Sequence, residues 1–182
     1  MTDKKYSIAV IGGTGALGFG LAVRWAQAGH SIIIGSRAQD SADRGAERLA
    51  VLAPEATIRG LENGAAAAAA EVVVLTVPFA NQAPMLEAIH AGCQGKIMVD
   101  VTVPLMPPKV RTVHLPSGGS AAKAAQVFLG EGVRVVSAFQ NVAADHLTDL
   151  GHDIDCDILV CGNDPDARQV VVGLAEDAAM RA

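Results

Sequence analysis

Short apolar runs rich in Val and Ile alternate along the chain with longer amphipathic or alanine-rich stretches. The apolar runs predict strands over residues 7–11, 31–35, 57–60, 72–77, 96–100, 133–139 and 155–161. The other stretches predict one helix that ends at Gly29 and further helices over about 39–52, 65–70, 82–91, 121–129 and 166–179. This alternation predicts an α/β fold in which helices cover both faces of a doubly wound, mainly parallel sheet.

A glycine cluster separates the first strand from the first helix. Gly13, Gly15 and Gly18 have the G-x-G-x-x-G spacing, which provides a tight turn, room for a pyrophosphate and close packing of helix on strand. The N-terminus of the helix then faces the anion. We therefore expect a Rossmann-type unit whose cofactor contacts include Gly13, Thr14, Gly15, Ala16 and Leu17. The alternative is a glycine-rich turn that binds no ligand.

The end of the second strand indicates which dinucleotide this unit binds. An Asp or Glu about 20 residues past the glycines would bind the ribose 2′-hydroxyl of NAD. This chain has Ser36 and Arg37 there, so a hydroxyl and a guanidinium are available to a 2′-phosphate. We therefore predict NADP(H) as the cofactor, with Arg44 as a further positive charge near it. Alternatively, Arg37 is a solvated turn residue and Arg44 faces water.

Several side chains should meet at the carboxyl ends of the central strands. The most apolar strand, residues 72–77, is expected beside the first strand, at the topological switch point where doubly wound sheets bind ligands. The residues expected to border the nicotinamide side of the cofactor at this edge are Thr76, Pro78 and Phe79, with Asn81 and Gln82 at the start of the next helix. Val77, Val101 and Ala138 are expected as further cofactor contacts. Pro78 and Phe79 have an alternative role as a helix start and a core residue.

Two further features lie at the same predicted edge. Asp100 ends a strand, where it either contacts a substrate or caps the following loop. That loop, residues 101–108, belongs to a segment whose four prolines between Pro104 and Pro116 prevent a helix. We expect an extended excursion that walls a second ligand pocket. Residues 1–140 are then the NADP-binding Rossmann domain, and residues 141–182 a small C-terminal extension of the same sheet.

Composition restricts the function classes. The chain of 182 residues is 51% hydrophobic but only 3% aromatic, and its net charge is −5. Aliphatic residues therefore build the core, and both the charge and the few aromatic residues argue against nucleic-acid binding. The apolar runs are too short for a membrane span, and the first residues do not resemble a signal peptide. We expect a soluble cytoplasmic protein without nucleic-acid or membrane partners.

The cysteines and histidines do not form a recognisable catalytic or metal motif. Cys93, Cys156 and Cys161 lack C-x-x-C spacing, so we expect no metal site or disulfide, and Cys156 and Cys161 should be buried at a strand. Solvated or capping roles suit the five histidines better than catalysis, although His114 and His146 merit a test. The single tyrosine, Tyr6, cannot form the Tyr-x-x-x-Lys pair of short-chain dehydrogenases.

Taken together, these motifs resemble those of the NADPH-dependent reductases of the deazaflavin coenzyme F420. The matching segments cover nearly the whole chain and include residues 11–18, 34–37, 75–79, 136–139 and 159–164. The resemblance implies that Thr14, Ser36 and Arg37 hold the 2′-phosphate side of NADP and that the Pro78 turn lies beside the nicotinamide. It also implies hydride transfer to a small-molecule acceptor, coenzyme F420, without a nucleophile or an acid/base pair, and analogy favours a homodimer.

Two other readings stay open at this point. One is an NADPH-dependent reductase of a flavin, an imine or a ferric chelate that shares the nucleotide-binding half. The other is a non-catalytic NADP(H)-binding protein that senses the redox ratio. Hydride transfer to an acceptor would distinguish the enzymes from the sensor.

Overall fold

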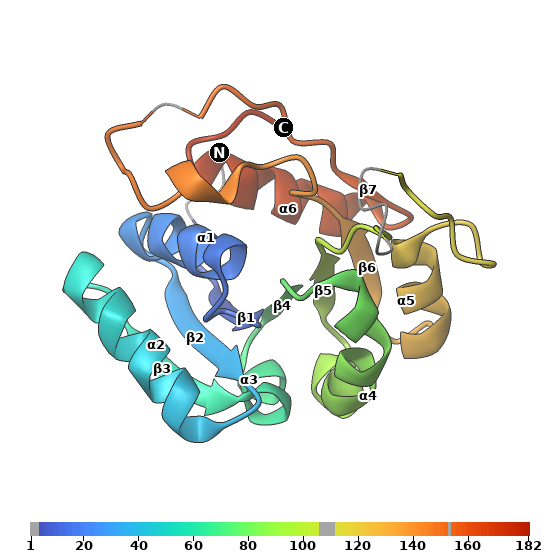
Figure 1. The fold of residues 1–182 in the computed structure, drawn as a ribbon, viewed down its shortest axis with the longest axis horizontal. Coiled ribbons are helices and arrows are strands. Elements are labelled where there is room, and N and C mark those ends of the chain that lie inside the picture. Colours follow the sequence, from blue (N-terminus) through green and yellow to red (C-terminus); the bar gives the residue numbers. More distant parts are fainter. Residues whose placement is uncertain (1–3, 106–111, 153) are drawn as a thin grey trace.

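The computed structural model describes residues 4–105, 112–152 and 154–182. Helices and strands follow one another in βα alternation over most of the chain (Figure 1). The strands are β1 (Ser7–Ile11), β2 (Ser31–Ser36), β3 (Ile58–Glu62), β4 (Val72–Leu75), β5 (Ile97–Asp100), β6 (Arg134–Ser137) and β7 (Cys161–Gly162). The α-helices are α1 (Ala16–Gln27), α2 (Gln39–Leu52), α3 (Asn63–Ala69), α4 (Gln82–Cys93), α5 (Ala121–Leu129) and α6 (Pro165–Asp177), with short 3₁₀ turns η1 (Phe79–Asn81) and η2 (Ala144–His146).

Within the described residues the strands form one sheet in the order β3-β2-β1-β4-β5-β6-β7. The first six strands are parallel, and β7 pairs with β6 in the antiparallel sense. β4 lies beside β1, with Ile11 opposite Leu75, so the order reverses between these two strands. The predicted α/β Rossmann-type fold and the central place of the fourth strand are confirmed.

Alternate residues of the strands pack against two helical layers. Ile8, Val10 and Ile34 point into one core with residues of α1, α2 and α6. Ala9 and Ile11 point into the other core with residues of α3, α4 and α5. Strands buried on both faces need apolar residues at every position, which explains the uninterrupted Val and Ile runs of the sequence. Figure 1 shows the two layers with the sheet between them.

Some predicted boundaries are wrong. The strand predicted over 57–60 continues to Glu62, and the helix predicted over 65–70 already begins at Asn63. The strand predicted to end at residue 77 stops at Leu75, although the Thr76 backbone N–H still donates to Ile11 O at 2.9 Å. The strand predicted over 133–139 ends at Ser137, and Phe139 takes a left-handed backbone conformation with φ 69°. Only residues 101–105 of the expected extended segment 101–108 lie within the described residues.

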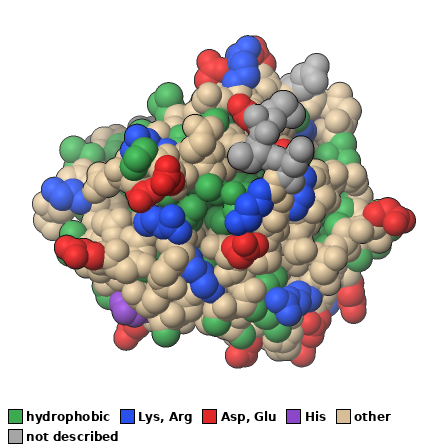
Figure 2. All heavy atoms as spheres, turned by 180° about the vertical axis from the view of Figure 1, so that it is seen from behind, with side chains coloured by type: hydrophobic (Ala, Val, Ile, Leu, Met, Phe, Trp, Pro, Cys, Tyr) green, Lys and Arg blue, Asp and Glu red, His purple; other side chains and the backbone are tan. Residues whose placement is uncertain are grey.

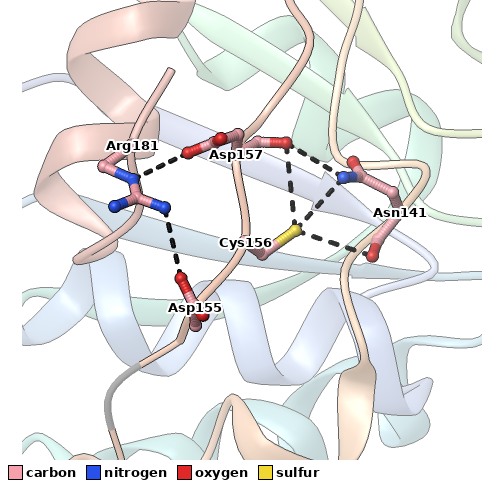
Figure 3. Close-up of polar contacts among 5 residues, drawn as sticks. All are labelled: Asn141, Asp155, Cys156, Asp157 and Arg181. Atoms are coloured by element: carbon pink, nitrogen blue, oxygen red, sulfur yellow. Dashed lines mark hydrogen bonds and ion pairs between the residues drawn. The ribbon is translucent and has the colours of Figure 1, made fainter.

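The strand predicted over 155–161 is also largely wrong. Only Cys161 and Gly162 join the sheet. The backbone N–H of Ile158 instead donates to Arg181 O at 2.7 Å, and Arg181 also pairs with the side chain of Asp157 (Figure 3). Around Ile158 this segment therefore hydrogen-bonds to the backbone of Arg181 and not to a strand of the sheet.

The two cysteines of this segment are not buried as predicted. Cys161 is exposed and Cys156 is partly exposed. The Asn141 side-chain amide donates to Cys156 Sγ at 3.1 Å and to Asp157 O at 2.9 Å (Figure 3). Cys156 therefore lies in a polar junction between the loop after β6 and the C-terminal segment.

Buried Arg24 on α1 fixes the loop that contains η2. Its guanidinium donates to the carbonyl oxygens of Leu147, Asp149 and His152 at 3.0 to 3.1 Å. Several carbonyl dipoles aimed at one cation stabilise its charge in a buried place. Through these contacts α1, which follows the glycine cluster, is anchored to the C-terminal part of the chain.

Acidic and basic side chains intermingle over the described residues of the face shown in Figure 2. Among the residues that the structure describes, no helix combines the length and the apolarity needed to span a bilayer.

Candidate functional site

A cleft of about 590 Å³ opens at the carboxyl ends of β1, β2 and β4. We call it the first cleft. It is lined by Gly12, Thr14, Gly15, Ser36, Arg37, Glu62, Asn63, Gly64, Thr76, Val77, Pro78, Asn81, Pro84, Met85 and Ala88. The glycine cluster, the end of β2 and the start of the segment after β4 therefore meet at the switch point of the sheet, where the sequence predicts a ligand.

The glycines of the cluster are required by close backbone packing. Gly12 has φ +80°, a conformation that L side chains rarely adopt. A Cβ on Gly18 would overlap Thr76 Oγ1, which itself donates to Ile11 O at 2.8 Å. A Cβ on Gly13 would lie 2.7 Å from Val10 O. The loop thus brings the start of α1 directly onto the ends of β1 and β4.

The start of α1 offers unpaired backbone donors. Phe19 N donates to Gly15 O at 2.8 Å, which is the first hydrogen bond of the helix. The N–H groups of Ala16, Leu17 and Gly18 therefore have no acceptor within the helix, and the helix dipole adds positive potential at the same place. This arrangement suits a diphosphate.

Ser36 and Arg37 lie at the end of β2, on the rim of the first cleft. Arg37 is exposed and makes no hydrogen bond or ion pair with any other described residue. Its guanidinium is therefore available to a ligand. Glu62 is paired with Ser36 in the sheet and also lines the cleft. The backbone N–H of Glu62 donates to the side chain of Gln39 at 3.2 Å, which connects β3 with the start of α2.

The structure brings only part of the predicted site into the first cleft. Thr14, Gly15, Ser36, Arg37, Thr76, Val77 and Pro78 line it. Arg44 is exposed, and its guanidinium donates to Ser41 Oγ at 3.1 Å on α2. Val101 and Ala138 are buried at the ends of later strands. Gly13, Ala16, Leu17, Arg44, Phe79, Gln82, Val101 and Ala138 are absent from the lining, so their contact with a cofactor stays a prediction.

Gln82 belongs to a buried hydrogen-bond network below the cleft. Its side-chain amide donates to Asp100 Oδ2 at 2.7 Å and to Thr102 Oγ1 at 2.9 Å. The other carboxylate oxygen of Asp100 accepts from Thr102 N at 2.9 Å. Burial raises the pKa of Asp100, and the hydrogen bonds from Thr102 and Gln82 act in the opposite direction. Asp100 thus caps the loop after β5, which was one of its two predicted roles.

A second cleft of about 620 Å³ lies beyond this network, at the ends of β5, β6 and β7. The segment that contains Thr102, Val103 and Pro104 forms one wall, as the sequence predicts. The start of α5 forms another wall, and the polar residues Ser137 and Gln140 also line the cleft. The Gln140 amide donates to Asp100 O at 2.8 Å, so this cleft also contacts the buried network.

Several residues of the first cleft were not predicted as cofactor contacts. Glu62, Asn63 and Gly64 follow the edge strand, and Pro84, Met85 and Ala88 form one stripe of α4. Their positions i, i+1 and i+4 are a helical periodicity that the sequence does show. It does not show that α3 and α4 face the same cleft, because that depends on how the two helices pack. Within the part of the chain that the structure describes, no three His, Cys, Asp or Glu side chains come together in a way that could hold a metal ion.

A known protein family matches the part of the chain that forms the first cleft. A family described as "NADP oxidoreductase coenzyme F420-dependent" matches residues 7–104, which include the glycine cluster, the end of β2 and Asp100. The chain is 41% identical over 175 residues to an F420-dependent NADP reductase of Methanothermobacter thermautotrophicus, covering 93% of this chain and 75% of that protein. It is 43% identical over 175 residues to the F420-dependent NADP reductase of Methanocaldococcus jannaschii, covering 92% and 78% of the two chains.

A solved structure agrees with the sequence relatives. A crystal structure from Arthrobacter sp. FB24, described as an F420-dependent NADP reductase, superposes with a TM-score of 0.74 at 26% identity, covering 96% of this chain and 81% of that chain. The sequence matches and this shared fold agree with the geometry of the first cleft. The chain belongs to the family of coenzyme F420-dependent NADP oxidoreductases.

Proposed function

We propose that this chain binds NADP(H) in the first cleft and catalyses hydride transfer between that nucleotide and a deazaflavin acceptor, coenzyme F420, in the second cleft. The observation that carries the proposal is the arrangement of the two clefts. Both open at the carboxyl edge of the sheet, and the buried contact between Gln82 and Asp100 lies between them. The curated relatives are named F420-dependent NADP reductases.

The residues of the first cleft fit a 2′-phosphorylated dinucleotide. The N–H groups at the start of α1 would hold the diphosphate. Arg37, which has no partner among the described residues, and the hydroxyl of Ser36 would hold the 2′-phosphate through charge-assisted hydrogen bonds. No carboxylate stands at the end of β2 itself to repel that phosphate, although Glu62 stands on the neighbouring strand.

The second cleft suits a larger ring system. Val103, Pro104, Val113 and Leu115 supply apolar surface, whereas Ser137 and Gln140 supply hydrogen-bonding groups. Mostly apolar walls with a few polar groups are typical of small-molecule sites. The Gln140 amide is held by Asp100 O and by Ser137 Oγ, each at 2.8 Å, so its orientation is fixed.

Both ligands carry the reactive chemistry, because NADPH supplies a hydride and the deazaflavin ring accepts one. The protein's task is therefore to align two rings and to exclude water from between them. Pro78 and Asn81, at the two ends of the turn after β4, line the first cleft, and the segment after β5 lines the second. This division of work explains why the site needs no nucleophile or metal.

A cytoplasmic location and a homodimeric state are further proposals. The exposed apolar side chains of Val127 and Phe128 on α5 would suit a contact with a second copy. Light scattering of the purified protein across a dilution series measures the mass directly, and a monomer at every concentration would contradict the dimer.

The proposed reaction is tested by mixing the protein with NADPH and coenzyme F420 and following the absorbance of the oxidised deazaflavin. Its loss, together with oxidation of NADPH, supports the proposal. A free flavin is run in parallel, and reduction of the flavin alone would indicate a flavin reductase. Tight NADPH binding with neither acceptor reduced would instead indicate a non-catalytic NADP(H)-binding protein.

A further inference from the structure

The side chain of Asn63 has unused hydrogen-bonding capacity in the wall of the first cleft. Asn63 is 6% exposed and lines the cleft at the start of α3. Its Oδ1 is buried and has no hydrogen-bond partner in residues 4–105, 112–152 and 154–182. Burying an unpaired polar atom costs free energy, and such atoms in native proteins call for an explanation. A bound ligand that donates a hydrogen bond to Asn63 Oδ1 would be such an explanation.

The neighbours of Asn63 indicate which part of a nucleotide would reach it. A Cβ on Gly35 would lie 2.9 Å from Asn63 Oδ1, so the amide lies against the end of β2. Gly35 directly precedes Ser36 and Arg37, the proposed partners of the 2′-phosphate. The group that contacts Asn63 is therefore close to the phosphorylated ribose.

The rest of the cleft wall suits a flat ring. Pro84, Met85 and Ala88 of α4 line the cleft together with Gly64 of α3. These residues offer apolar surface and, at Gly64, space without a side chain. A base carried by the phosphorylated ribose would bury its faces against this surface and turn one polar edge toward Asn63.

We propose that Asn63 is the residue that recognises the adenine base of the nucleotide, through the base's N6 amino group and an adjacent ring nitrogen. A primary amide has a donor and an acceptor side by side, and adenine presents the complementary pair. This inference rests on the proposed NADP(H) function and adds the base-reading residue to it. Asn63 is a binding residue and takes no part in the chemical step.

Titration calorimetry of NADP⁺ and of its 1,N6-etheno analogue tests the assignment. The etheno bridge removes the N6 hydrogens and blocks the ring nitrogen beside them. We expect wild-type protein to bind the analogue about tenfold more weakly than NADP⁺, as the loss of one or two hydrogen bonds implies. In Asn63→Ala the affinity for NADP⁺ should fall about tenfold, and the two ligands should bind within about twofold of each other. An unchanged preference for NADP⁺ in Asn63→Ala would overturn the assignment.

Two further measurements separate the possible outcomes. Asn81→Ala changes an exposed amide of the same cleft and should keep the wild-type preference. Asn63→Leu removes the unpaired acceptor, so the melting temperature of the ligand-free protein should stay the same or rise. A marked fall in melting temperature with unchanged NADP⁺ affinity would show that the asparagine is purely structural.

If wild-type protein binds neither NADP⁺ nor adenosine 2′,5′-bisphosphate, the proposed function itself fails. If it binds both and the asparagine variants behave as wild type, only the base assignment fails.

Discussion

The side-chain amide of Gln82 donates a 2.7 Å hydrogen bond to the carboxylate of Asp100, a residue with no solvent exposure. The same amide reaches Thr102 Oγ1 and, at 3.2 Å, Ala121 O. One residue of α4 thereby connects the end of β5 with the segment that walls the second cleft and with the first turn of α5. Of the residues that Gln82 contacts, Thr102 and Ala121 line the second cleft.

Replacing Gln82 by Leu should therefore destabilise the protein. The substitution leaves a buried carboxylate without one of its donors, and hydrogen bonds to charged groups are worth about 1.5–3 kcal/mol. We expect the free energy of unfolding in urea to fall by about that amount. Gln27→Leu is the matched control, because its exposed amide donates only to the neutral carbonyl of Leu52, and should cost less than about 1 kcal/mol. Equal losses in both variants would contradict the special role of Gln82.

The pH dependence of stability should carry a signature of His30. His30 Nδ1 accepts from Tyr6 N at 3.0 Å, so the neutral ring carries its proton on Nε2, which lies 2.8 Å from Asp177 Oδ2. Burial lowers the pKa of His30 below its ordinary 6.5, and Asp177 opposes this effect. Below about pH 6.5 the unfolded chain therefore binds more protons at His30 than the folded protein does. The contribution of the neutral His30 to the free energy of unfolding is complete above that pH and is lost as the pH falls toward the lowered pKa.

Urea unfolding of wild-type protein and His30→Gln between pH 7.5 and 5 measures this effect. Glutamine can accept from Tyr6 and donate to Asp177, but it does not titrate. We expect the variant to lose less stability than the wild type on acidification. A loss as steep as that of the wild type would assign the pH dependence to other groups.

The parts of the site that local sequence determines could be predicted from it. The glycine spacing, the buried strands and the Ser36-Arg37 pair each depend on residues close together in the chain, and the structure places Thr14, Ser36 and Arg37 around one cleft as expected. The wall formed by Asn63 and Met85 could not be predicted. Those residues come from different helices, and their proximity follows from packing over the sheet.

Contacts between residues distant in sequence account for features that the local pattern does not predict. Residues 155–161 have the apolar alternation of a strand, with Ile158 buried and Leu159 72% exposed, but Arg181 takes the hydrogen bond of Ile158. Gln82 follows the Pro78 turn, and its expected contact with the cofactor stays a prediction. The sequence does not show that its amide donates to the buried carboxylate of Asp100. In both places a partner distant in sequence determines the hydrogen bonding.

The glycine cluster gives a stringent test of the loop geometry. A Cβ at Gly18 would overlap Thr76 Oγ1 and lie 3.1 Å from Gly12 O, so in Gly18→Ala either the start of α1 or the Thr76 side chain, with its hydrogen bond to Ile11 O, must shift. We expect a loss of about 1–3 kcal/mol in stability and a fall in NADPH affinity of at least tenfold. Gly118→Ala is the control, because a Cβ there meets nothing within 4 Å and the backbone is not left-handed. Normal NADPH binding by Gly18→Ala would show that the loop tolerates a shift.

The choice between NADPH and NADH depends on Arg37. Its guanidinium lines the first cleft and has no partner among the described residues, so Arg37→Ala removes no contact within that part of the protein. A charge-assisted contact with the 2′-phosphate is worth about 1.5–3 kcal/mol, so NADPH affinity should fall roughly ten- to a hundredfold while NADH affinity hardly changes.

Arg44→Ala removes a positive charge from the same region, but Arg44 hydrogen-bonds Ser41 and does not line the cleft. Its affinity for NADPH should change less than about threefold, since only a screened long-range charge is lost. Fluorescence titration of both nucleotides against both variants measures the four changes. Equal weakening of NADPH and NADH by Arg37→Ala would mean that Arg37 supports the loop and does not read the phosphate.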